Sequence, residues 1–248
     1  MNPTRVIFGL HTVLARLRAD ARSIIELCVD DSRDDHRMRD LLQSAESAGV
    51  RILRMPGKRL DGMAGNGAHQ GVVARVSGAS AHRSLDDLLD ALTVPPMLLA
   101  LDGVTDPHNL GACLRVADAA GVQAVIAPKD RAAGIGATVS KVASGAAEVL
   151  PYFMVTNLAR TLDELKERSI WIVGADERGE RDLYQADLPS SICWVLGAEG
   201  EGMRRLTRER CDELVKIPMS GSVASLNVSV AAGVCLFESR RRLMAGKG

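Results

Sequence analysis

The chain has 248 residues, of which 46% are hydrophobic and 25% charged, the composition of a globular protein that can bury a core. Basic and acidic residues number 31 each, so binding of nucleic acid through bulk positive charge is disfavoured. No apolar run reaches the length of about eighteen residues that a membrane span requires. The N-terminus lacks a signal-peptide pattern, which predicts a cytoplasmic protein.

Five cysteines lie scattered along the chain without the spacing of metal ligands. Such an odd-numbered, dispersed set is typical of buried small hydrophobic side chains, and no metal site is expected. Basic residues cluster at 51–59, 204–210 and 240–242. Each cluster, taken alone, is interpreted as a solvated helix face rather than an RNA contact.

Short alternating elements are predicted for the first third of the chain. The hydrophobic pattern predicts a helix at 11–19, a helix capped by Asp34 that runs to residue 48, and strands at 24–29, 50–55 and 70–76. These elements predict a small α/β domain over residues 1–77. A small, polar, glycine-containing segment follows, so residues 78–84 are interpreted as a linker.

The alternation restarts in residues 85–248. Ser84 is expected to cap a helix at 85–92, and a wholly apolar strand follows at 97–101. Further strands are expected at 124–127, 170–174, 193–196 and 214–217, and helices at 110–120, 137–149, 158–168, 204–211 and 227–244. This order predicts a parallel sheet covered on both faces, whose ligands bind at the carboxyl ends of the strands.

The first of three unusual strand-end loops spans residues 102–109. Asn109 is predicted to be the N-cap of the following helix, and Gly111 permits close approach of a backbone or a ligand. Arg115 lies too far round the helix to share a face with Asn109. It either pairs with Asp118 in solvent or faces an anion above the helix N-terminus, and spacing alone favours the pair with Asp118.

The second loop, at 197–203, holds three glycines and two glutamates. Its glycine order differs from the G-x-G-x-x-G of dinucleotide sites, and its two carboxylates would repel a pyrophosphate. The loop therefore favours a neutral or cationic ligand such as a sulfonium, although glycine loops are commonly simple turns. Glu199 is the more interesting glutamate because it lies nearer the strand end.

The third loop, at 218–227, leads into the final helix. Ser225 is predicted to be its N-cap, with Asn227 in its first turn, and either residue taken singly indicates ordinary capping. The spacing of Val230, Val234 and Phe237 predicts the core-facing stripe of this helix.

Taken together and in this order, the three segments resemble the signature motifs of the SpoU-type RNA 2′-O-methyltransferases. The matching stretches are 109–115, 197–202 and 225–231, within a resemblance that covers roughly residues 96–244. Segments 8–14 and 69–74 are similar to the small substrate-binding domain of this family, which resembles an RNA-binding ribosomal protein. The combination is most similar to members that methylate one guanosine in the P loop of bacterial 23S rRNA.

The resemblance implies a fold, a co-substrate and a set of site residues. The fold is an α/β domain with a deep trefoil knot, the co-substrate is S-adenosylmethionine, and a homodimer completes the site without a metal. The implied catalytic residues are Asn109, Arg115, Glu199, Ser225 and Asn227, and the implied cofactor contacts are Gly197, Ile217 and Leu226. Because a guanidinium stays protonated, Arg115 is expected to hold the adjacent RNA phosphate and to stabilise developing alkoxide charge.

Three alternatives remain open. A nucleotide-dependent oxidoreductase is disfavoured, because no strand-to-helix turn carries the dinucleotide fingerprint. A non-catalytic RNA-binding or ribosome-assembly protein would bind no S-adenosylmethionine. Within the family, the target could be a tRNA or a different rRNA nucleotide.

Overall fold

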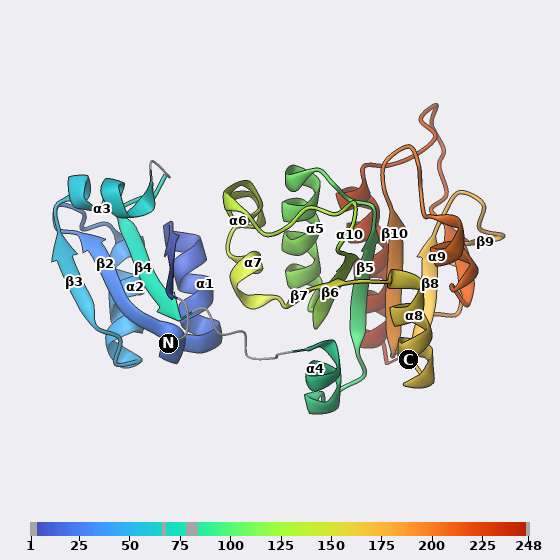
Figure 1. The fold of residues 1–248 in the computed structure, drawn as a ribbon, viewed down its shortest axis with the longest axis horizontal. Coiled ribbons are helices and arrows are strands. Elements are labelled where there is room, and N and C mark those ends of the chain that lie inside the picture. Colours follow the sequence, from blue (N-terminus) through green and yellow to red (C-terminus); the bar gives the residue numbers. More distant parts are fainter. Residues whose placement is uncertain (1–3, 66–67, 78–83, 247–248) are drawn as a thin grey trace. The chain divides into compact units, whose positions relative to one another are not determined.

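The computed structural model describes residues 4–65, 68–77 and 84–246, and contacts divide the chain into two units (Figure 1). The first unit extends to residue 81 and also includes Ser144–Val149, and the second holds the remainder. The expected linker at 78–84 lies, apart from Ser84, outside the described residues.

A four-stranded sheet in the order β1-β4-β2-β3 forms the centre of the first unit. Its strands are β1 (Thr4–Phe8), β2 (Ile24–Asp30), β3 (Ile52–Met55) and β4 (Val72–Ser77). Strand β4 is antiparallel to both β1 and β2, whereas β3 runs parallel to β2. The sequence predicted all of these strands except β1.

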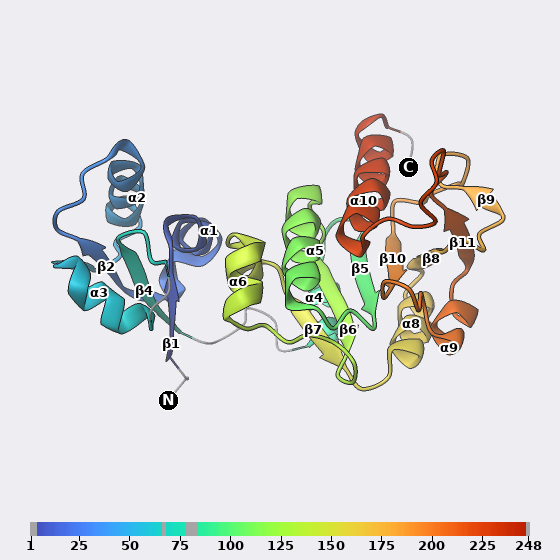
Figure 2. The same cartoon turned by 90° about the horizontal axis from the view of Figure 1, so that it is seen from above.

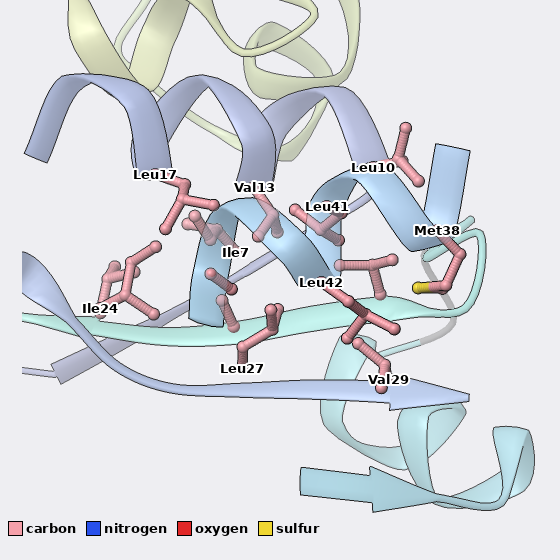
Figure 3. Close-up of a cluster of buried hydrophobic side chains, with 14 residues drawn as sticks. Ile7, Leu10, Val13, Leu17, Ile24, Leu27, Val29, Met38, Leu41 and Leu42 are labelled. Carbon is pink, nitrogen blue, oxygen red and sulfur yellow. The ribbon is translucent and has the colours of Figure 1, made fainter. Parts of the chain in front are cut away.

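Helices cover both faces of this sheet. They are α1 (Leu10–Asp20), followed by the short 3-10 helix η1 (Ala21–Ser23), α2 (His36–Ser47) and α3 (Gly57–Ala64). Alternation along β2 places Leu27 and Val29 in the cluster formed with α1 and α2 (Figure 3), and Cys28 in the cluster formed with α3. The predicted cap of α2 was wrong by one residue, because the Asp35 carboxylate accepts from the backbone N of Met38 at 3.1 Å.

The second unit is a seven-stranded sheet in the order β7-β6-β5-β10-β8-β11-β9, with every neighbouring pair parallel. Its strands are β5 (Met97–Asp102), β6 (Ala124–Pro128), β7 (Tyr152–Val155), β8 (Trp171–Ala175), β9 (Arg181–Asp182), β10 (Ile192–Gly197) and β11 (Glu213–Lys216). The predicted parallel sheet is confirmed. The short edge strands β7 and β9 were not predicted.

Helices pack on both faces of this sheet as well. Helices α4 (Leu85–Ala91) and α8 (Leu158–Glu167) share a buried cluster with Val195 of β10. On the opposite face of β10, the Trp194 indole donates to Ser239 Oγ of α10 (Val228–Met244) at 2.9 Å. Helix α10 lies beside α5 (Pro107–Ala120), as Figures 1 and 2 show. Helix α9 (Arg205–Glu209) links β10 to β11.

Two predictions about the helices expected in residues 85–248 were wrong. The helix expected at 137–149 is interrupted, because Ser144 and Gly145 have positive φ angles of 51° and 98° between α6 (Ala137–Ala143) and α7 (Ala146–Val149). The stripe expected to face the core in α10 is instead partly open, with Val230 51% and Phe237 49% exposed. Within the described ranges, no helix is long and apolar enough to cross a membrane.

Candidate active site

Parallel register brings the ends of the central strands to one edge of the sheet. Gly197 at the end of β10 lies opposite Asp102 at the end of β5, and Leu196 lies opposite Ala175 of β8. The loops that follow these strands therefore begin side by side, as expected for a ligand site of a parallel sheet.

Three of the predicted site residues are joined by hydrogen bonds. The side-chain nitrogen of Asn227 donates to Oδ1 of Asn109 at 2.9 Å and also to Oε1 of Glu199. The backbone N of Val228 donates to the same carboxylate oxygen at 3.3 Å. One residue from each of the three sequence motifs thus meets in a single network, although 118 positions separate Asn109 from Asn227.

Asn227, and not the predicted Ser225, is the N-cap of α10. Its Oδ1 accepts from the backbone N of Ser229 at 2.9 Å and from the Ser229 hydroxyl at 2.6 Å. This capping bond leaves only the amide nitrogen of Asn227 to face Asn109 and Glu199, so the cap sets the orientation of the amide.

The predicted N-cap at Asn109 was also wrong. The Asp106 carboxylate caps α5 by accepting from the backbone N of His108 at 3.2 Å and of Asn109 at 3.1 Å, and Pro107 occupies the first helical position. Because Asp106 satisfies these amides, the Asn109 side chain is available for Asn227.

A cavity of about 770 Å³ adjoins the network. All three predicted cofactor residues, Gly197, Ile217 and Leu226, line it together with Glu199 and Ser225. A Cβ at Gly197 would lie 2.1 Å from the carbonyl carbon of Gly202, so only glycine permits this close backbone approach. The cavity has a volume typical of small-molecule sites.

Sequence reasoning missed several charged residues on the cavity wall, namely Asp176, Glu177, Arg178, Asp182, Arg208 and Lys216. Asp176 follows β8 directly and pairs with Arg208 of α9, with Nε and Oδ2 3.2 Å apart. The available signal was a carboxylate at the end of a buried strand: Asp176 directly follows β8, and Asp102 is the last residue of β5.

Arg115 stands apart from the network. It is exposed on α5, and within the described part of the chain it forms neither a hydrogen bond to Asn109, Glu199 or Asn227 nor an ion pair with Asp118. The interpretation of Arg115 as a partner of Asp118 was therefore wrong. Burial raises the pKa of the Asp118 carboxyl.

The cysteines have the predicted structural role. All five are free, four are buried and Cys211 is partly buried. Burial, reinforced by the Glu199 carboxylate, raises the pKa of the Cys113 thiol to about 12, so this neighbour of the network stays a neutral thiol. Across the described ranges, no group of three His, Cys, Asp or Glu side chains is arranged to hold a metal.

Comparison with known proteins gives two family matches and close relatives over nearly the whole chain. Residues 96–237 match the SpoU rRNA Methylase family, and residues 6–81 match the family of RNA 2′-O ribose methyltransferase substrate binding domains. The 23S rRNA (guanosine-2′-O-)-methyltransferase RlmB of Ralstonia nicotianae is 61% identical over 98% of this chain and 97% of its own. The enzyme of the same name from Neisseria meningitidis is 56% identical over 96% of this chain and 95% of its own.

A solved structure shares the fold. The SpoU methyltransferase AviRb from Streptomyces viridochromogenes, in complex with AdoMet, has a TM-score of 0.76 and 25% identity over 98% of this chain and 92% of its own.

Proposed function

The chain belongs to the SpoU rRNA methylase family, and from this premise we propose that it transfers a methyl group from S-adenosylmethionine to a guanosine ribose 2′-hydroxyl in 23S rRNA. The observation that carries the proposal is the network of Asn109, Glu199 and Asn227 beside the cavity. We further propose that the target lies in the P loop and that the first unit holds the RNA.

The cavity suits a sulfonium-bearing co-substrate. Gly197 provides a wall without a side chain. The acidic residues of the wall (Asp176, Glu177, Asp182, Glu199 and Glu201) outnumber the basic ones (Arg178, Arg208 and Lys216), which favours a cation over a phosphate. Gly197, Ile217 and Leu226 would hold S-adenosylmethionine, which supplies an electrophilic methyl group when bound.

The chain's own residues would orient the ribose and stabilise charge. A hydroxyl is a poor nucleophile at neutral pH, so its attack needs a fixed direction and stabilisation of the developing negative charge. Asn227 is fixed by its capping bonds, and Glu199 is fixed by Asn227 and Val228, so both can orient the reacting ribose. Ser225 would add a hydroxyl from the cavity wall, and Arg115 would hold the neighbouring phosphate.

We propose that two copies of the chain form the active enzyme. Val230 and Phe237 lie seven residues apart on α10, hence on one face, and each leaves about half of its surface exposed. A second copy would cover this apolar face. It would also bring an Arg115 to the network, since the exposed Arg115 is not joined to the network of its own chain.

The chain path supports the trefoil knot as a further proposal. Strand β10 lies between β5 and β8, the chain then crosses to β11 beyond β8, and α10 returns to pack on β10 and α5. This return would pass through the loop that follows β10. Pulling single molecules from both ends would leave an extension shorter than that of an unknotted chain, whereas full contour length would contradict the knot.

Arg115 provides the direct test of these roles. We expect Arg115→Ala to abolish methyl transfer while S-adenosylmethionine affinity, measured by calorimetry, stays near normal. Mixing it with inactive Asn227→Ala should restore about a quarter of the activity, because half of the dimers would contain one complete site. No restoration would place the site within one chain. Loss of cofactor affinity in Arg115→Ala would refute the assigned role.

Calorimetry of the unaltered chain separates the enzyme from a non-catalytic RNA-binding or ribosome-assembly protein. The enzyme binds S-adenosylmethionine, and the assembly protein does not. If the chain binds S-adenosylmethionine but methylates only tRNA, the proposed reaction is supported and the proposed 23S rRNA target is refuted.

A further inference from the structure

The arginines of the 204–210 cluster are all engaged in ion pairs. Arg204 pairs with Asp102, Arg205 with Glu209, Arg208 with Asp176 and Arg210 with Asp163. The positive charge of this cluster is therefore largely neutralised by paired carboxylates, and only part of the cluster is a solvated helix face. Two of its pairs reach the ends of the strands that form the candidate site.

The loop at 197–203, which carries Glu199, has little internal support. One backbone hydrogen bond, from Gly202 N to Ala198 O at 2.9 Å, closes it, and Gly200 and Gly202 have positive φ angles of 79° and 68°. Glu199 lies at its exposed tip. Strand β10 holds the first end of the loop, so the position of this carboxylate also depends on what holds the second end, at Met203 and Arg204.

On one side, Arg204 ties the end of the loop to β5. The backbone N of Arg204 donates to Asp102 Oδ2 at 2.9 Å, and its Nε donates to Oδ1 at 2.6 Å. The Asp102 side chain is fully buried (0% exposed), and a buried carboxylate requires such a charged partner.

On the other side, Arg208 ties the loop to the end of β8. Its Nε donates to Asp176 Oδ2 at 3.2 Å, and its terminal nitrogen donates to the carbonyl of Met203, the last loop residue, at 2.7 Å. The Asp176 side chain is 6% exposed. A planar guanidinium can bridge two acceptors in fixed geometry, whereas a lysine ammonium is a single point of charge.

Strands β5 and β8 are the two neighbours of β10 in the sheet. We infer that Arg204 and Arg208 are positioning residues that clamp the 197–203 loop from both sides, and so set where Glu199 meets Asn227 and Val228. They act through Glu199: their hydrogen bonds go to Asp102, Asp176 and Met203, and Arg208 also lines the cavity. The inference rests on the proposed function for its effect on methyl transfer.

A double-mutant cycle tests the clamp. Arg208→Lys should lower kcat about 10- to 100-fold in the otherwise unaltered chain, because small displacements in a site have effects of this size. In a Glu199→Ala chain, single-turnover measurements should show that Arg208→Lys changes the rate by less than about two-fold, since the side chain that Arg208 positions is already removed. An equal loss in both backgrounds would overturn the inference.

Hydrogen exchange gives a second readout that does not depend on activity. Amides at 198–203 and 227–229 should exchange faster in Arg208→Lys and Arg204→Lys and should stay unchanged in Arg205→Lys, whose pair with Glu209 is exposed on the same helix. Unchanged exchange in the first two variants would overturn the clamp. A chain that methylates no RNA would refute the proposed function. Hydrogen exchange would still show whether Arg204 and Arg208 hold the loop in place.

Discussion

Asn227 shows how one side chain can combine a structural and a functional role. Its oxygen caps α10 through Ser229, and its nitrogen binds Asn109 and Glu199. Sequence reasoning selected all three members of the network but assigned the caps to Ser225 and Asn109. The difference arises because Asp, Asn and Ser are near-equivalent caps by type, and only the folded chain shows which one reaches the free amides.

The close backbone contact at Gly197 predicts that a side chain there would weaken both cofactor binding and stability. Gly197→Ala should lower S-adenosylmethionine affinity and reduce the free energy of unfolding by about 1–3 kcal/mol, because its Cβ would meet the backbone of Gly202 and Met203 at 2.1–2.2 Å. Calorimetry and denaturant unfolding measure the two effects. Gly134→Ala is the matched control, since a Cβ there meets nothing within 4 Å. Normal affinity in Gly197→Ala would show that the cofactor does not use this wall.

At the scale of elements, the sequence predicted the length of α10 correctly but not which of its faces is buried. The pattern placed a helix at 227–244, and the structure has Val228–Met244. Val230, Val234 and Phe237 do share a face, yet the buried face is that of Ala232, Cys235 and Leu236. Periodicity finds apolar stripes, but it does not distinguish a stripe that packs in the core from one that the fold leaves partly exposed.

An ion-pair cluster in the C-terminal half of α10 predicts how stability depends on pH. Hydrogen bonds from Arg241, supported by Arg242, hold the pKa of the Glu238 carboxyl at about 2, below its ordinary value of 4.5. A lowered pKa in the folded state stabilises the protein above pH 4.5, and the stabilisation is lost as the pH falls toward 2.

Glu238→Gln should therefore be less stable than the unaltered chain by about 1–3 kcal/mol at pH 7, and this gap should narrow between pH 4.5 and 3. Denaturant unfolding at each pH measures the gap. A gap that stays constant over this range would show that the carboxylate charge is not the source of the stability.

For the whole molecule, local patterns predicted the α/β alternation and the parallel sheet of the second unit. They did not predict the strand order, which inserts β10 between β5 and β8 and brings Asp102 and Asp176 to either side of one loop. Non-local pairing of this kind leaves no periodic signal in the chain. Resemblance to a known family therefore identified the three motifs as a set. The hydrogen bonds that join them, and the contacts of Arg204 and Arg208, could be found only in the folded structure.

Ribose methylation of 23S rRNA in cells with and without this gene tests the central claim most directly. We expect that one 2′-O-methylguanosine, in the P loop, disappears with the gene and returns with the unaltered chain but not with Asn227→Ala. A 23S rRNA whose ribose methylation is unchanged, or loss of a tRNA methyl group alone, would contradict it.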